Sequence, residues 1–315
     1  MRKYRASNHT PVASLFLLLI LGIISAAALG GILWAVDNTL HFYLVVAFPL
    51  FAGLIAGGLL VLGVRSGKVR SPLLAALIGL LTGVLIFGVY HFATYYVTFR
   101  GVVRDQYVQD VGKTPTDAEL DQLINKGLTQ FKISDTGFIG YLKFAAQEGL
   151  TITNSTSSSS SDVGNIDLKD QWAFVYWGVE ILLAGIIAAV LAGREAGQPF
   201  DEDANSWYGK PTVLALATLK SRKALDKALK DGDYQTAGSL LTVQNIRYPR
   251  NEVLLRRSPV ASGSLAQQDI YLTVNYCQRK GRSVVKKAGL ISPSELDLMK
   301  RAIPQGEISN AAARH

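Results

Sequence analysis

Four long apolar stretches dominate this sequence of 315 residues. They cover residues 11–36, 40–64, 72–99 and 172–193. A helix needs about 20 apolar residues to cross a bilayer, because each residue rises about 1.5 Å through a hydrocarbon core about 30 Å thick. All four stretches reach this length. The sequence therefore predicts an integral membrane protein built on an all-α bundle of four transmembrane helices.

The distribution of charge predicts the orientation of these spans. Residues 100–171 hold 7 basic and 10 acidic side chains, a net charge of −3, whereas residues 194–315 hold 19 basic and 12 acidic ones, a net charge of +7. Short segments rich in Lys and Arg stay in the cytoplasm. We therefore expect a cytoplasmic N-terminus (residues 1–10), a cytoplasmic C-terminal domain and an insertion, 100–171, on the outside. A plasma (inner) membrane is the expected location.

The insertion between the third and fourth spans has local order of its own. Thr116 and Glu119 form the S/T-x-x-E pattern of a capping box, which predicts a helix running to about Gly127. Residues 138–144 are mostly apolar and aromatic, so they are expected to lie at the headgroup layer or to cap the bundle. Residues 155–162 are rich in serine, which predicts a flexible linker. The short turn 37–40 should lie on the same side.

The basic C-terminal segment, 194–315, predicts a small α+β domain. Hydrophobic periodicity predicts helices over 212–230 and 234–243, followed by strands over 252–256, 269–276 and 283–290. Ser292 and Glu295 form a second capping box that opens a last helix reaching Ile303. The predicted fold is thus a transmembrane bundle with a small cytoplasmic α+β domain.

Small residues recur at helical spacing inside the first three spans. Such faces let helix backbones approach closely, and lipid offers no hydrophobic drive for helices to associate. The faces predict packing within one bundle or, alternatively, the seam of a homo-oligomer. In the second span Pro49 is expected to kink the helix. The packing glycines are Gly22, Gly30, Gly53, Gly57, Gly79 and Gly83.

His91 and Glu180 are the ionisable side chains that interrupt the spans. Each lies eight residues from the outer end of its span, so both should sit about 12 Å below the outer surface. A carboxylate in hydrocarbon is costly and turns toward the bundle interior to find a partner. We expect His91 and Glu180 to pair, as a structural clamp or as a proton or ligand site. Tyr90, Tyr95 and Tyr176 are candidates for the same layer.

The segment Tyr276-Cys277-Gln278-Arg279-Lys280-Gly281 resembles the knuckle of a zinc ribbon, in which two cysteines bind metal at a tight turn. Residues 199–208 are similar to a second knuckle. The resemblance implies four ligand positions, of which three are Asp201, Ala204 and Lys280, so Cys277 stands alone. Tetrahedral zinc needs four N or S ligands. We therefore expect no metal and no cofactor.

Catalytic signatures are missing from the sequence. Its four histidines do not form an HExxH or three-histidine pattern, and no glycine-rich phosphate loop is present. A high pI beside a membrane is a topology signal or an attraction for anionic lipid, so no nucleic acid partner is expected.

We therefore predict a protein that is not an enzyme: a membrane-embedded interaction or assembly subunit presenting its cytoplasmic domain to an unknown protein partner. A second copy of the chain is a further candidate partner, and the glycine faces would then form the seam of a homo-oligomer. The alternative is a small transporter or channel component that uses the His91/Glu180 layer. A transmembrane sensor ranks third, because no output module follows the spans.

Overall fold

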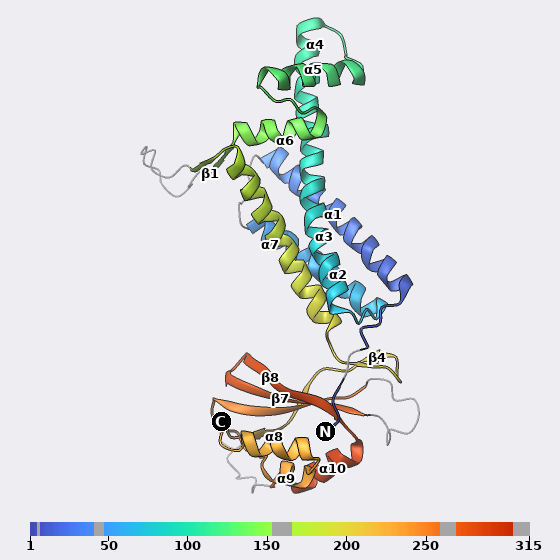
Figure 1. Ribbon diagram of the computed structural model, residues 1–315, viewed down its shortest axis with the longest axis vertical. Coiled ribbons are helices and arrows are strands. Elements are labelled where there is room, and N and C mark those ends of the chain that lie inside the picture. Colours follow the sequence, from blue (N-terminus) through green and yellow to red (C-terminus); the bar gives the residue numbers. More distant parts are fainter. Residues whose placement is uncertain (5–6, 41–46, 153–165, 259–268, 305–315) are drawn as a thin grey trace, which may run out of the picture. The chain divides into compact units, whose positions relative to one another are not determined.

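The structure, a computed structural model, describes residues 1–4, 7–40, 47–152, 166–258 and 269–304 (Figure 1). The chain divides into two compact units. The membrane unit comprises Asn8–Gly197, and the α+β unit comprises Gln198–His315 together with Met1–Ser7. Buried apolar clusters occur in both units, so each has a core of its own.

The membrane unit is built on the helices α1 (Val12–Leu40), α2 (Ala47–Gly67), α3 (Pro72–Ala93) and α7 (Gln171–Ala196). Four helices in the described residues, one of them α3 with its continuation, are long and apolar enough to cross a membrane. Large apolar side chains also point outward, as Leu62 does at 63% exposure and Leu73 at 71%. Lipid is the solvent that suits such faces. The predicted multi-pass membrane character is therefore confirmed.

Glycines lie where these helices touch. α7 packs against both α2 and α3, and α1 packs against α3. A Cβ atom added at Gly79 would lie 2.6 Å from the Cα of Ala189, which is closer than real side chains approach. The six glycines selected from the sequence divide by helix: Gly22 and Gly30 face α3, whereas Gly53, Gly57, Gly79 and Gly83 face α7. These faces are thus occupied inside one bundle.

The third helix runs further than the sequence predicted. A π-helical turn, η1 (Thr94–Phe99), follows α3, and α4 (Arg100–Val111) continues the same rod. The helix therefore continues past residue 99, while the predicted end of the membrane span at that residue stays a prediction. Residues 100–111 are more polar than the span before them but contain no proline, and the helix stops only at Gly112, whose φ of 73° ends it in the left-handed region.

The expected kink at Pro49 stays a prediction. The structure describes α2 from Ala47 onward, and the residues 41–46 before it lie outside the described ranges.

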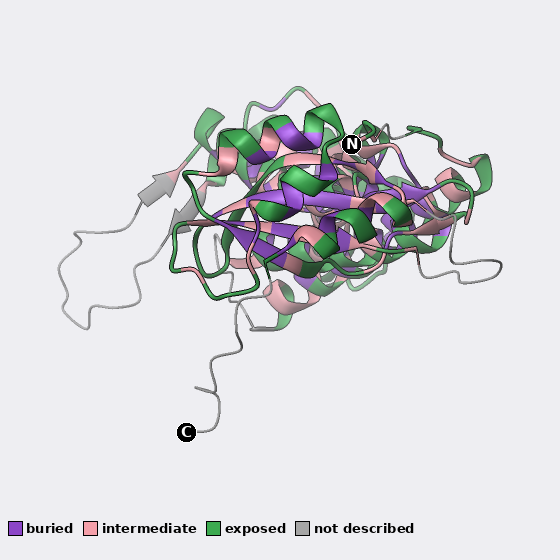
Figure 2. Cartoon of the chain, turned by 90° about the horizontal axis from the view of Figure 1, so that it is seen from below, coloured by how far each residue is buried: buried purple, intermediate pink, exposed green. Residues whose placement is uncertain are grey.

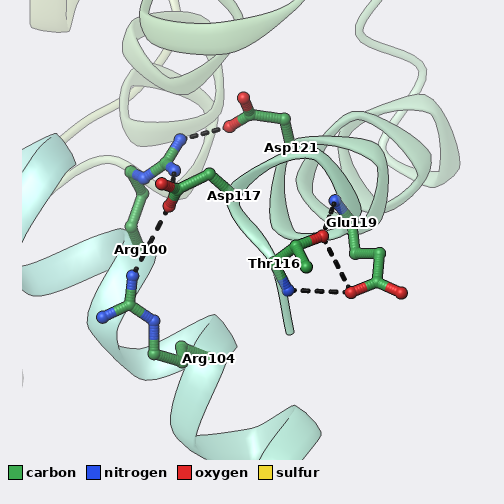
Figure 3. Close-up of polar contacts among 6 residues, drawn as sticks. All are labelled: Arg100, Arg104, Thr116, Asp117, Glu119 and Asp121. Atoms are coloured by element: carbon green, nitrogen blue, oxygen red, sulfur yellow. Dashed lines mark hydrogen bonds and ion pairs between the residues drawn. The ribbon is translucent and has the colours of Figure 1, made fainter. Parts of the chain in front are cut away.

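The insertion forms a short helical array above α3. It contains α5 (Asp117–Gln130), α6 (Gly137–Glu148) and the paired strands β1 (Leu150–Ile152) and β2 (Ile166–Leu168). The capping box is confirmed: the Glu119 carboxylate accepts a 2.8 Å bond from the Thr116 N–H (Figure 3). Arg100 of α4 pairs with Asp117 and Asp121, which fixes α5 to α4 (Figure 3). The predicted serine-rich linker, 155–162, lies outside the described residues.

The α+β unit contains a four-stranded antiparallel sheet in the order β5-β6-β7-β8. Three helices pack on one face of it around buried side chains such as Leu229, Leu272 and Met299. Buried residues are most frequent in β7, whereas the first half of β8 is exposed. Figure 2 colours buried residues purple and exposed ones green. Its elements are β3 (Phe200–Asp201), β4 (Ser206–Trp207), β5 (Thr212–Ala217), α8 (Arg222–Asp231), α9 (Tyr234–Ser239), β6 (Arg250–Arg256), β7 (Ile270–Arg279), β8 (Arg282–Ile291) and α10 (Pro293–Ala302).

The helix predicted over 212–230 is wrong in its first half. Residues Thr212–Ala217 form β5, which pairs with β6, and α8 starts only at Arg222. Apolar residues at 214, 217, 225 and 229 fit a helical period by chance, although the strand begins with two β-branched residues. By contrast, the capping box at Ser292 and Glu295 is confirmed at the start of α10.

The first residues of the chain belong to the α+β unit. Arg2 forms a β-bridge with Leu290 of β8, and its guanidinium pairs with Asp269. The Tyr4 hydroxyl accepts a 3.0 Å bond from the N–H of Phe200, and its ring lies edge-on to Tyr271. Residues 1–4 and 198–304 therefore lie on the same side of any membrane that the four helices cross.

Close packing at Gly83 predicts a large effect of a small substitution. In Gly83→Val the new side chain meets the backbone of Gly185 on α7, so we expect a loss of about 1–3 kcal/mol in the free energy of unfolding. Unfolding of the full chain in mild detergent measures it. Gly88→Val is the matched control on the same helix, because nothing lies within 4 Å of that position. Equal stability of the two variants would contradict the packing.

Candidate functional site: a polar layer at one end of the bundle

Polar side chains gather at the end of the bundle where α3 passes into η1. The first contact joins α1 to α3: the Tyr90 hydroxyl donates a 2.8 Å hydrogen bond to Asp37 Oδ2. A hydrogen bond to a charged acceptor contributes about 1.5–3 kcal/mol to stability. This pair therefore sets the position of α1 beside α3.

Glu180 forms the second contact within α7. The hydroxyl of Tyr176, one helical turn earlier, donates to its Oε1 atom. Glu180 is only 4% exposed, although it lies in a helix surrounded by apolar residues. Its carboxyl group therefore faces the bundle interior, as a costly group in a membrane does.

His91 contributes an aromatic face to the layer. Its ring lies edge-on to Trp177, with centroids 4.8 Å apart, and edge-on to Tyr90 at 5.0 Å. Its Nε2 atom is buried and has no hydrogen-bond partner among the described residues. The structure thus places His91 beside the turn of α7 that carries Glu180, while a direct bond between the two residues stays a prediction.

Two hydrogen bonds in series hold the end of α1 to the π-helical turn. Trp34 Nε1 donates a 3.0 Å bond to Thr98 Oγ1, which donates a 2.9 Å bond to Asn38 Oδ1. π-helical turns often occur at functional sites, since they shift the side chains that follow. Here the extra residue in the turn brings Thr98 within reach of α1.

An aromatic cluster covers the layer. Tyr95 and Phe99 of η1 pack against Tyr141 of α6, with ring centroids 5.3 and 5.0 Å apart. Burial, and then the negative charge of Asp37, raise the pKa of Tyr141 to about 12. The Tyr141 hydroxyl is therefore neutral at physiological pH, and it is close enough to the polar layer for the charge of Asp37 to act on it. Of the two expectations for residues 138–144, capping of the bundle agrees with these contacts.

Beyond the layer the bundle interior is closely packed. Buried polar groups there bond within their own helices: Ser25 donates to the Leu21 carbonyl and Thr82 to the Ile78 carbonyl. Gly53 and Gly83 meet the backbone of α7 directly. The described part of the interior therefore offers no continuing row of free polar groups.

The sequence located only part of this layer. Tyr90, Tyr176, His91 and Glu180 all lie in it, whereas Tyr95 belongs to the aromatic cluster above. Asp37 was assigned to a turn, but α1 continues to Leu40 and carries Asp37 in its last turns. An acidic residue directly after the apolar run 11–36 was the available signal. The sequence contains no signal that places Trp34 and Thr98 in the layer.

The α+β unit has a separate recess of about 250 Å³ beside the start of α10. Ile270, Pro293 and Leu296 supply its apolar part, and Arg257, Asp269 and Asp297 are among its polar lining. Apolar pockets with a few polar groups commonly receive a ligand or a partner side chain. Asp269 is already paired with Arg2.

The residues of the zinc-ribbon resemblance form ordinary hairpins. Asp201 Oδ1 accepts 3.1 Å bonds from the N–H groups of Asp203 and Ala204, which closes the β3–β4 turn. Cys277 is a buried thiol in β7. In the part of the chain that the structure describes, no group of three or more His, Cys, Asp or Glu side chains could hold a metal ion.

Comparison with protein families, with curated proteins and with solved structures finds no match to this chain. Its chemistry therefore has to be inferred from its own residues.

The Tyr90–Asp37 bond predicts an energetic coupling between α1 and α3. Tyr90→Phe leaves a partly buried carboxylate without its donor, and we expect it to cost about 1–3 kcal/mol. Asp37→Asn should have a similar cost, and the double variant should cost less than the sum. Unfolding of the four proteins in detergent gives the coupling energy. Tyr96→Phe, at an exposed ring on the same helix, is the control. Additive effects would show that the bond contributes nothing.

Proposed function

We propose that this protein is a non-catalytic membrane subunit whose bundle anchors the α+β unit and presents it to a protein partner in the cytoplasm. The observation that carries the proposal is the close approach of α7 to α2 and α3. Where Gly79 meets Ala189 and Gly83 meets Gly185, the helices touch through their backbones. Such contacts hold the helices together and leave no space between them at these positions.

Charge supports the cytoplasmic placement. The chain ends that share the α+β unit are basic, and the insertion on the opposite side is acidic overall. Lys- and Arg-rich segments next to spans are retained in the cytoplasm. A bacterial plasma membrane would suit this arrangement.

The recess beside α10 is the surface that we assign to the partner. Interface anchors are apolar side chains that enter pockets, surrounded by a polar rim. Ile270 and Leu296 would receive such an anchor, while Arg257 and Asp297 would orient it by charge. Both charged residues are exposed and free to contact another protein.

One observation favours a second candidate, a proton-coupled transporter component. The buried His91 Nε2 has no partner among the described residues and lies in the same layer as Glu180. Ionisable groups inside a membrane often mark proton relays. Beyond the layer, Ser25 and Thr82 bond within their own helices and do not continue the row of polar groups, which makes this the weaker proposal.

Photo-crosslinking in native membranes tests the proposed interface. A crosslinking residue replacing the exposed Asp297 of the full-length chain should yield one discrete protein adduct, and Arg257→Glu should abolish it. The same probe at Lys227, on the outer face of α8, is the control. Absence of an adduct at position 297, or equal adducts at both positions, would contradict the assignment of the recess.

A further inference from the structure

The β7–β8 hairpin ends in a tip at which the two strands stay paired up to the turn (Figure 1). Arg279 pairs with Arg282 across the two-residue turn Lys280-Gly281, where Gly281 has a φ of 79°. Left-handed glycine in a two-residue turn matches the twist of the strands. All residues from 278 to 286 are exposed.

This tip carries only positive charge. Its cations are Arg279, Lys280, Arg282 and Lys286, and no acidic residue occurs between positions 270 and 294. The side chains of Arg279, Lys280 and Arg282 make no ion pair within the described ranges, and Lys286 lies over the ring of Tyr276. These charges are therefore available to an anionic surface.

Two exposed valines lie among these cations. Val284 is 53% exposed and Val285 is 56% exposed. Successive side chains of a strand point to opposite faces, so each face of the tip has an apolar group beside basic ones. The interface of a bilayer offers the matching combination, phosphate groups above an apolar layer.

The basic face of α8 differs from the tip in this respect. Lys223, Lys227 and Lys230 are exposed, but Asp226 and Asp231 lie between and beside them. No large apolar residue of α8 is exposed. This helix has cations without an apolar group that could enter lipid, which makes it the natural comparison.

We propose that the β7–β8 tip docks on the anionic phospholipid surface of the bilayer that holds the spans, with its cations on the phosphates and its valines at the acyl boundary. The α+β unit follows the span α7 directly at Gln198. Such a tether gives a high effective concentration, so weak individual contacts suffice. Valines rather than exposed aromatic rings favour lipid over single-stranded nucleic acid, which binds by stacking. The docking is independent of any protein partner.

A fluorescent label at Ser283→Cys in the full-length chain tests this docking. Burial raises the pKa of the native Cys277 thiol to about 11, so labelling at neutral pH favours the new cysteine. The protein is placed in nanodiscs of phosphatidylcholine, with or without phosphatidylglycerol, that contain a lipid carrying a nitroxide quencher. We expect quenching only with phosphatidylglycerol, and its loss between about 0.1 M and 1 M salt, where the Debye length falls from about 10 Å to 3 Å.

Charge and apolar variants separate the two contributions. Each cation near an anionic surface strengthens binding about fivefold, so reversing Arg279, Lys280, Arg282 and Lys286 to Glu should abolish the quenching. Val284→Ser with Val285→Ser should weaken it and keep its salt dependence. Reversing Lys223, Lys227 and Lys230 should leave it unchanged. Quenching that is absent, equal in neutral nanodiscs, or lost equally with the α8 variant would overturn the proposal. So would a label that responds to an oligonucleotide and not to anionic lipid.

Discussion

The backbone contact of α7 with α2 and α3 is the constraint on which the rest of the membrane unit depends. In lipid the hydrophobic effect does not hold helices together, so van der Waals contact between closely spaced backbones has to do so. Gly53, Gly79 and Gly83 remove the side chains that would prevent this approach. On α7 the matching surface is formed by Ala184, Ala188 and Ala189, which are all buried.

This packing explains where the polar groups lie. Backbones in contact leave no space for ionisable side chains, so these are found toward the end of the bundle, beside η1. There Tyr90 satisfies Asp37 and Tyr176 satisfies Glu180. Tyr95 of η1 and Tyr141 of the insertion cover the layer. Both acids of the layer thus have a tyrosine donor, as polar groups in such a place require, and the layer suits a fixed helix register better than a moving pathway.

Features of the fold were predictable from the sequence where one local physical signal dominated. Length and hydropathy identified the spans, and the capping boxes at Thr116 and Ser292 identified two helix starts. The strand at Thr212–Ala217 was missed because its apolar spacing also fits a helix. Asp37 was missed because its partner, Tyr90, lies 53 residues away. No local pattern reports a contact of that kind, and the same holds for the bridge of Arg2 to β8.

Proton flux in proteoliposomes tests the claim of a closed anchor most directly. A pH-sensitive dye inside vesicles records flux after a pH jump, for the wild-type chain and for Glu180→Gln. A bundle sealed by the contacts of Gly79 and Gly83 should leak no faster than vesicles without protein, and the substitution should change nothing. Flux above that background that disappears with Glu180→Gln would contradict the anchor and establish the polar layer as part of a proton pathway.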